Sequence, residues 1–301
     1  MLAKKKRALF IINRHSGFAN FFAIEDRIHS VCEKNDTACT IDDTQHRAHA
    51  VTLARDAASA GYDYVIAVGG DGTINEVAQG LVGTQTAMGI LPKGSGNGLA
   101  RHLGIPSQLP DAIDTLFTNT VVRMDTLLIN NRLSLNVSGI GFDGHIANLF
   151  ANEKIRGLLG YARLTLSEML KFPEFDADLT VDGKTATARA FIIAFANSSQ
   201  YGNNVRVAPH ASVCDGIFDL TIIKKFTLAD ISFIHGFLKG KLGESDLCDM
   251  MVAKKATIKT SHPVPYHIDG ESCGLADSFT IVLQPASLSV LAPSTLADKK
   301  N

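Results

Sequence analysis

The 301-residue chain lacks a strong charge of either sign, because 29 Lys and Arg residues balance 30 Asp and Glu residues for a formal net charge of -1. A nucleic-acid-binding protein is expected to carry a broad basic field, so the composition argues against this class. Cysteine is also scarce: the five cysteines are scattered, and no two have C-x-x-C spacing. We therefore expect a reduced cytosolic protein without a cysteine-based metal site.

Long apolar runs are missing as well. No stretch of the sequence reaches the roughly 18 consecutive apolar residues of a membrane-spanning helix. The basic tail from Lys4 to Arg7 precedes an apolar stretch that stops at Asn13, which is too short for a signal peptide. We expect a cytoplasmic protein. The basic tail is a candidate for contact with anionic lipid headgroups, and a solvated terminus is the simpler alternative.

The pattern of apolar segments predicts two domains. Residues 1–122 alternate short apolar strands with helical periodicity, which predicts an α/β domain with a parallel sheet. Residues 123–284 show strands, such as 132–140, joined by turns, such as Asn130-Asn131 and Asp182-Gly183. This pattern predicts a mainly antiparallel β domain with helical insertions near residues 146–170 and 228–238. The C-terminal segment 285–301 is expected to pack back on the first domain.

The most informative segment runs from Gly69 to Thr73, with the sequence G-G-D-G-T. It follows the apolar run 64–68 and precedes residues with helical spacing, so the glycines lie at a strand-to-helix turn. Such a turn lets the backbone and the helix N–H groups approach a phosphate. Asp71 would repel the phosphate unless it holds a metal or takes a proton, which makes it a candidate catalytic residue. The alternative is a tight turn in which Asp71 caps the helix.

A second glycine loop, from Lys93 to Gly98, follows the apolar strand 87–91. Two such loops on neighbouring strands can hold a polyphosphate from both sides. The P-loop spacing G-x-x-x-x-G-K-[ST] is absent from the chain. Asn97 as a plain helix N-cap is the alternative for this loop.

Two other patterns are interpreted as ordinary structure. The segment from Gly139 to Gly144 formally matches G-x-G-x-x-G, but it lies outside the β-α repeats, so a turn is favoured over a dinucleotide site. His46 and His49 could supply two metal ligands. Without a further ligand nearby in the sequence, a solvated or phosphate-contacting role is favoured.

Two acidic turns lie late in the chain, at Asp215-Gly216 and at Asp269-Gly270-Glu271. An isolated Asp-Gly pair is usually a hairpin turn. Glu271 adds a second carboxylate directly after such a turn. Paired carboxylates suit a phosphoryl transfer in which Mg²⁺ neutralises the nucleotide and a base takes the proton of the acceptor. Glu271 is therefore the second candidate catalytic residue.

Together these motifs resemble the diacylglycerol kinase catalytic-domain family, which also includes sphingosine kinases, ceramide kinases and bacterial lipid kinases. Asn13 to Gly17 resembles N-P-x-S-G, Gly69 to Val77 matches G-G-D-G-T-x-N-E-V, and Pro92 to Arg101 resembles P-x-G-[ST]-x-N-D-x-A-R. The two acidic turns match the D-G and D-G-E signatures of the family. Because the motifs occur in the right order from residue 13 to 271, the resemblance covers nearly the whole chain.

The resemblance implies an ATP-dependent and Mg²⁺-dependent kinase that phosphorylates a lipid hydroxyl at the inner face of the membrane. The lipid would be diacylglycerol, a sphingoid base or a related molecule. Asp71 and Glu271 would handle Mg²⁺ and acceptor activation, and the similarity leaves open which of them is the base. A structural Mg²⁺ would be held by the Asp215 carboxylate with backbone oxygens near Ser212 and Ile217. The residues implied to contact ATP are Asn13, Thr44, Gly70, Asp71, Gly72, Thr73, Glu76 and Ser95.

The sequence departs from the family pattern in two places. Arg14-His15 replaces the residues that the family usually has between Asn13 and Ser16. The segment from Ser95 to Gly98 is more similar to the G-S-G-N of sphingosine and ceramide kinases than to the bacterial T-x-N-D, which weakens the case for diacylglycerol as the substrate. Arg156 and Arg163 resemble phosphate-contacting arginines of sphingosine kinases, with a solvated helix face as the alternative. An NAD kinase, which shares the G-G-D-G-T loop, and a catalytically silent nucleotide-binding regulator are the rival functions. The sequence leaves open whether the protein forms a homodimer.

Overall fold

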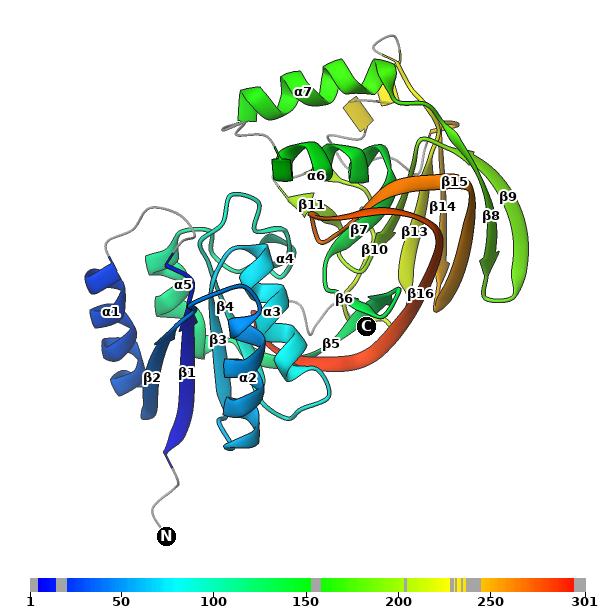
Figure 1. Ribbon diagram of the computed structural model, residues 1–301. Coiled ribbons are helices and arrows are strands. Elements are labelled where there is room, and N and C mark those ends of the chain that lie inside the picture. Colours follow the sequence, from blue (N-terminus) through cyan, green and yellow to red (C-terminus); the bar gives the residue numbers. More distant parts are fainter. Residues whose placement is uncertain are drawn as a thin grey trace. The chain divides into compact units, whose positions relative to one another are not determined.

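The computed structural model describes residues 5–14, 21–152, 158–202, 205–227, 230, 232–233, 235–236 and 245–294 (Figure 1). The chain forms two compact units. Unit 1 comprises Met1–Asp125 and Ala286–Asn301, and unit 2 comprises Thr126–Pro285. The sequence places these boundaries at 122/123 and 284/285. The predicted fold class, a parallel α/β part followed by a mainly antiparallel β part, is confirmed.

Unit 1 is built from a parallel sheet in the order β4-β3-β1-β2. The end of β16 adds a further parallel strand beside β4, with Val290 opposite Met88. The elements of unit 1 are β1 (Lys6–Ile12), α1 (Phe21–Lys34), β2 (Thr37–Asp43), α2 (His49–Ser59), β3 (Tyr64–Gly69), α3 (Asp71–Leu81), β4 (Ala87–Pro92), α4 (Gly98–His102), α5 (Leu109–Thr115), a 3-10 turn (Leu116–Thr118) and the start of β5 (Thr120–Ile129).

Helices cover both faces of this sheet. Helix α2 packs against α3, and α1 packs against α5. Strand β4 is buried along its whole length, as expected for a parallel strand with covered faces. The carboxyl ends of the strands meet at one edge: Asn13 N donates to Val68 O (3.0 Å), Thr44 N to Ile12 O (2.9 Å) and Lys93 N to Gly69 O (2.8 Å). The two glycine loops after β3 and β4 and the segments that follow β1 and β2 therefore share one edge of the sheet.

Unit 2 contains an antiparallel sheet in the order β14-β13-β10-β7-β15, followed by β16. Besides the second parts of β5 and β16 (Glu271–Ala292), its described elements are β6 (Arg132–Ser134), β7 (Val137–Gly141), α6 (Phe142–Asn152), α7 (Leu158–Lys171), β8 (Phe175–Val181), β9 (Lys184–Ala190), β10 (Ile192–Ala196), β11 (Gln200–Gly202), β12 (Val205–Arg206), β13 (Phe218–Ile223), β14 (Cys248–Ala253) and β15 (Lys255–Ile268).

Strand β15 pairs with different neighbouring strands along its length. Residues 256–260 pair with β8, whereas Tyr266 and His267 pair with β7, and the register with β16 shifts after Lys259. The described residues of unit 2 form two apolar cores. One is centred on strand residues that include Phe195 and Phe218, and the other joins α6 to the sheet, with the rings of Phe142 and Phe191 stacked at 4.5 Å between centroids.

The hairpin turns were predicted correctly. The turns Asn130-Asn131, Asp182-Gly183 and Asp269-Gly270 each have positive φ at both central residues, with values from 46° to 86°. This is the type I′ geometry that matches the twist of two antiparallel strands. These turns join β5 to β6, β8 to β9 and β15 to β16.

Some predicted elements differ from the structure. The strand expected over residues 132–140 is broken between β6 and β7, where the backbone N–H groups of Leu135 and Asn136 bond to a side chain instead of a strand. The insertion near 146–170 is two helices, α6 and α7, and most of the helix expected near 228–238 falls outside the described residues. Within the part of the chain that the structure describes, no helix is both long and apolar enough to cross a bilayer.

The segment from Gly139 to Gly144 is not the turn that the sequence predicted. It is a direct junction in which β7 ends at Gly141 and α6 begins at Phe142. Close packing explains its glycines. A Cβ on Gly139 would lie 2.0 Å from Asp143 Oδ2, and one on Gly144 would lie 2.4 Å from Pro265 O. The G-x-G-x-x-G pattern here therefore serves the contact of α6 with its neighbours.

Candidate functional site

The two glycine loops of unit 1 touch each other through their backbones. A Cβ added to Gly94 would lie 2.7 Å from the Cα of Gly70, and one added to Gly70 would lie 3.3 Å from the Cα of Gly94. A side chain at Gly94 would force the loops apart, and one at Gly70 would crowd them. The glycines thus bring the N-terminus of α3 and the loop after β4 together, and helix N–H groups at such a place attract phosphate.

Asp71 links the same two loops. Its Oδ2 accepts a hydrogen bond from Asn97 N (2.9 Å), and its Oδ1 accepts one from Gly98 N (3.0 Å). Gly70, not Asp71, is the N-cap residue of α3. The Asp71 carboxylate instead binds the first N–H groups of the neighbouring helix α4. These two hydrogen bonds fix the position of the second loop.

Asn97 holds the second loop from within. It is the N-cap residue of α4 with φ 50°, but its side chain makes no cap hydrogen bond. Its Oδ1 accepts from Gly94 N (2.9 Å), and its Nδ2 donates to Gly94 O (2.8 Å). The N-cap interpretation of Asn97 is therefore wrong for its side chain, which closes the loop on itself.

The other residues predicted to contact ATP lie around these loops in unit 1. Asn13 Nδ2 donates to Thr73 Oγ1 (3.1 Å), so the end of β1 is joined to α3. Glu76 Oε1 accepts from Ala48 N (2.8 Å) at the start of α2. Thr44 lies just beyond the end of β2, and Ser95 is exposed in the second glycine loop.

Two cations that the sequence did not single out as ligands lie near this edge. Burial and the charge of Arg14 lower the pKa of Lys93 below its ordinary value. Arg14 itself is paired, with Asp43 at 2.7 Å and Glu25 at 2.6 Å. The effect of the Arg14 charge on the pKa of Lys93 is the observation that places these two cations near each other. Two cations that repel each other at the same edge as a helix N-terminus are suited to an anion.

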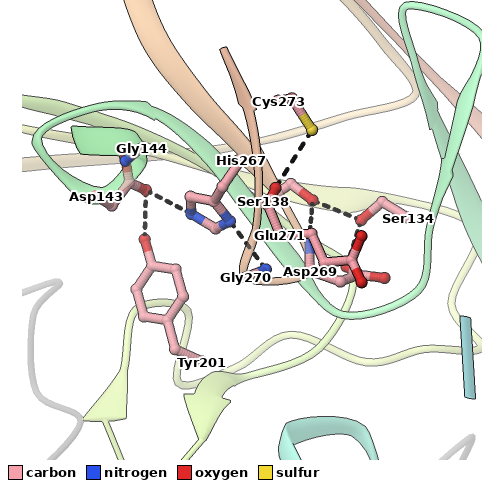
Figure 2. Close-up of polar contacts among 10 residues, drawn as sticks. All are labelled: Ser134, Ser138, Asp143, Gly144, Tyr201, His267, Asp269, Gly270, Glu271 and Cys273. Atoms are coloured by element: carbon pink, nitrogen blue, oxygen red, sulfur yellow. Dashed lines mark hydrogen bonds and ion pairs between the residues drawn. The ribbon is translucent and has the colours of Figure 1, made fainter. Parts of the chain in front are cut away.

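In unit 2, the D-G-E hairpin is held by Asp269. Its Oδ1 accepts from Ser134 Oγ (2.8 Å) and Asn136 N (3.0 Å), and its Oδ2 accepts from Leu135 N (2.9 Å). Asp269 N donates to Ser138 Oγ (3.1 Å). Asp269 therefore ties the turn to the break between β6 and β7 (Figure 2). Glu271, the first residue of β16, is exposed.

The loop before β13 was predicted to hold a structural Mg²⁺. Asp215 is exposed and accepts from Ile217 N through Oδ1 (3.2 Å), while Ser212 Oγ accepts from Cys214 N (3.4 Å). Two causes, burial and the charge of Asp215, raise the pKa of the nearby Asp219 to about 6. A carboxylate, a hydroxyl and backbone oxygens are hard donors of the kind Mg²⁺ prefers, so these residues fit the ion.

Some residues that the sequence singled out lie outside the described part of the chain, and others show no metal site. Ser16, Gly17 and Arg156 lie outside the described residues, as does the side chain of Arg163. His46 and His49 stack on each other at 4.8 Å between ring centroids. Searched among the described residues alone, no group of three or more His, Cys, Asp or Glu side chains could hold a metal ion.

Comparison with known proteins finds two family models along the chain. Residues 7–129 match the family model of the diacylglycerol kinase catalytic domain, and residues 136–292 match that of the YegS C-terminal NAD kinase beta sandwich-like domain. A relative from Chromohalobacter salexigens, named "Probable lipid kinase YegS-like", is 31% identical over 81% of this chain and 80% of its own. The protein named diacylglycerol kinase of Bacillus subtilis is 29% identical over 90% of this chain and 91% of its own.

Solved structures share the fold. A crystal structure of a diacylglycerol kinase from Bacillus anthracis has a TM-score of 0.73 at 20% identity and covers 97% of this chain and 98% of its own. An NAD kinase from Archaeoglobus fulgidus in complex with ATP has a TM-score of 0.56 at 14% identity, covering 98% and 96%. The class of protein is thus a kinase of NAD kinase-like fold. The chain belongs to the diacylglycerol kinase catalytic-domain family, as the sequence motifs predicted.

Proposed function

We propose that the protein is an ATP-dependent and Mg²⁺-dependent lipid kinase that transfers the γ-phosphate of ATP to a lipid hydroxyl at the membrane surface. The observation that carries this proposal is the backbone contact between the two glycine loops, which Asp71 joins by two hydrogen bonds. It sets the N-terminus of α3 beside the second glycine loop, an arrangement suited to a polyphosphate. The lipid acceptor is inferred from the names of relatives at about 30% identity.

Unit 1 would bind ATP, and unit 2 would supply the base. We assign the base role to Glu271 because it is exposed on a turn that Asp269 fixes. The carboxylate of Asp71 has a different role, since its two oxygens accept hydrogen bonds from Asn97 N and Gly98 N and so hold the second glycine loop in place. Glu271 would take the proton of the lipid hydroxyl as that oxygen attacks the γ-phosphorus, and the bond from the γ-phosphorus to the bridging oxygen would break so that ADP leaves. Mg²⁺ bound with ATP would neutralise phosphate charge.

The function is tested by incubating the protein with γ-labelled ATP, Mg²⁺ and vesicles made from a total lipid extract, and in parallel with NAD. The expected result is label in one organic-soluble product, whose identification names the acceptor. Label in NADP without a lipid product would contradict the proposal. The absence of transfer to either acceptor, with ATP bound, would favour a silent regulator.

Lys93 is expected to bind the phosphates of ATP. Its ammonium is partly buried beside the glycine loops, and Arg14 is already engaged with two carboxylates. A hydrogen bond to a charged group contributes about 1.5–3 kcal/mol, so Lys93→Met should raise the Kd for ATP about 10- to 100-fold. Calorimetric titration with ATP measures this. Lys34→Met, at the exposed end of α1, is the matched control. Equal ATP affinity in the two variants would remove Lys93 from the site.

The loop from Ser212 to Ile217 is expected to bind Mg²⁺. Free Mg²⁺ at about five times its Kd stabilises a protein by about 1 kcal/mol, which raises the melting temperature by about 2–4 °C. Asp215→Asn should abolish this rise, whereas Asp176→Asn, which removes an exposed carboxylate from β8 of the same unit, should keep it. Differential scanning fluorimetry with and without Mg²⁺ makes the measurement in the absence of ATP. An undiminished rise in Asp215→Asn would exclude this loop as the site.

A further inference from the structure

The junction between β7 and α6 carries a residue that the proposed function does not use. Asp143 Oδ2 accepts from Tyr201 OH (2.9 Å) and lies 3.2 Å from His267 Nε2, while Oδ1 accepts from Gly144 N (2.7 Å). His267 is only 3% exposed and the Asp143 side chain 11%. Figure 2 shows the three side chains converging, from α6, β11 and β15. Gly139 leaves room for the carboxylate, since a Cβ there would lie 2.0 Å from Oδ2.

The hydrogen bonds assign the tautomer of His267. Gly270 N donates to Nδ1 at 3.1 Å, and an N–H can donate only to a ring nitrogen that carries a lone pair. Nδ1 is therefore unprotonated. The ring proton resides on Nε2 and is donated to Asp143. A chain of hydrogen bonds thus runs from Gly270 through His267 to Asp143, which Tyr201 also contacts.

This chain ends at the peptide next to Glu271. Gly270 is the second central residue of the type I′ turn, with φ 86°, and Glu271 follows it directly. From the other side, Asp269 ties the same turn to Ser134 and Ser138. The backbone that carries the Glu271 carboxylate is therefore held by two separate networks. Such support matters for a base, because a misplacement of about 1 Å can cost about 100-fold in rate.

We propose that Asp143 and His267 are positioning residues for Glu271: the Asp143 carboxylate selects the Nε2–H tautomer of His267, whose Nδ1 then holds Gly270. The inference rests on the proposed function for its catalytic consequence. Neither residue needs to touch ATP or the lipid. Their effect on the reaction is through the position of the turn.

Asp143→Asn tests the selection of the tautomer. Gly144 N requires an acceptor at Oδ1, so the new amide must turn its NH₂ toward Nε2 of His267. The ring then has to carry its proton on Nδ1, facing the N–H of Gly270. An amide in place of such a carboxylate is known to enforce the wrong tautomer in serine proteases. We expect kcat to fall about 10- to 100-fold, the range that follows from a displacement of about 1 Å or less, with KM for ATP unchanged.

Two substitutions of His267 separate positioning from a merely structural role. In His267→Asn, the amide oxygen can replace Nδ1 as the acceptor for Gly270 N, but the link to Asp143 is lost. In His267→Gln, the amide reaches the place of Nε2 and can bond Asp143, but Gly270 N loses its acceptor. We expect His267→Asn to keep kcat within about 3-fold of wild type and His267→Gln to lose about 10- to 100-fold. Equal losses of kcat, or a larger loss in His267→Asn, would overturn the proposal.

A measurement without turnover completes the test. The ring ¹⁵N shifts of His267, assigned by comparison with the His267→Gln spectrum, should show an unprotonated Nδ1 and a protonated Nε2 in the wild type, and the reverse in Asp143→Asn. A protonated Nδ1 in the wild type would contradict the inference even in an active kinase. Failure of the proposed function has another signature, since the wild-type protein then phosphorylates no lipid.

Discussion

Replacing Glu271 with Gln should lower kcat for lipid phosphorylation about 100- to 10,000-fold, the usual contribution of a general base. The amide keeps the size of the side chain and cannot take a proton. Glu271 lies in unit 2, on a turn held through backbone and Asp269 contacts, so the substitution should leave that turn in place. The Kd for ATP should therefore stay within about 2-fold of wild type, because a base acts on the rate and not on binding.

Steady-state kinetics with a saturating lipid dispersion gives kcat, and calorimetric titration gives the Kd for ATP. Asp277→Asn is the matched control, since it removes an exposed carboxylate from the same strand β16. That variant should keep wild-type kcat. A Glu271→Gln enzyme with unchanged kcat would remove Glu271 from the chemical step, and a rise in the Kd for ATP as large as the loss in kcat would make it a binding residue.

The fold could be predicted from the sequence because its signals are local. The run from Tyr64 to Val68 and the glycines after it specify a buried strand and a strand-to-helix turn without reference to the rest of the chain. The pairs Asp182-Gly183 and Asp269-Gly270 specify type I′ turns by their tolerance of positive φ. Such features depend on a few adjacent residues.

The contacts that give each site residue its task could not be predicted in this way. Asp71 bonds to residues 26 and 27 positions later, and Asp269 bonds to Ser134, which is 135 positions earlier. Asp143 appeared to belong to a turn, yet it meets a histidine 124 positions away. Each of these pairs depends on which strands lie next to each other and in which register. Residue type alone predicts that a carboxylate needs donors, but not where they come from.

Asp71→Asn should have the opposite kinetic pattern to Glu271→Gln. The carboxylate accepts Asn97 N at one oxygen and Gly98 N at the other. An amide can accept at only one of these positions and turns an NH₂ toward the second N–H. Each hydrogen bond to a charged acceptor contributes about 1.5–3 kcal/mol, so the second glycine loop should leave its place beside Gly70.

The expected result is a rise of about 10- to 100-fold in the Kd for ATP, which corresponds to the loss of one such hydrogen bond. At saturating ATP, kcat should fall less than in Glu271→Gln. Asp56→Asn, an exposed carboxylate of α2 in the same unit, should bind ATP as the wild type does. Melting temperatures of both variants show whether unit 1 stays folded. If Asp71→Asn instead bound ATP normally and lost kcat as severely as expected for Glu271→Gln, Asp71 would be the base. The hydrogen bonds from Asn97 and Gly98 would then serve to orient that base, because the same two donors can hold either a loop or a carboxylate in position.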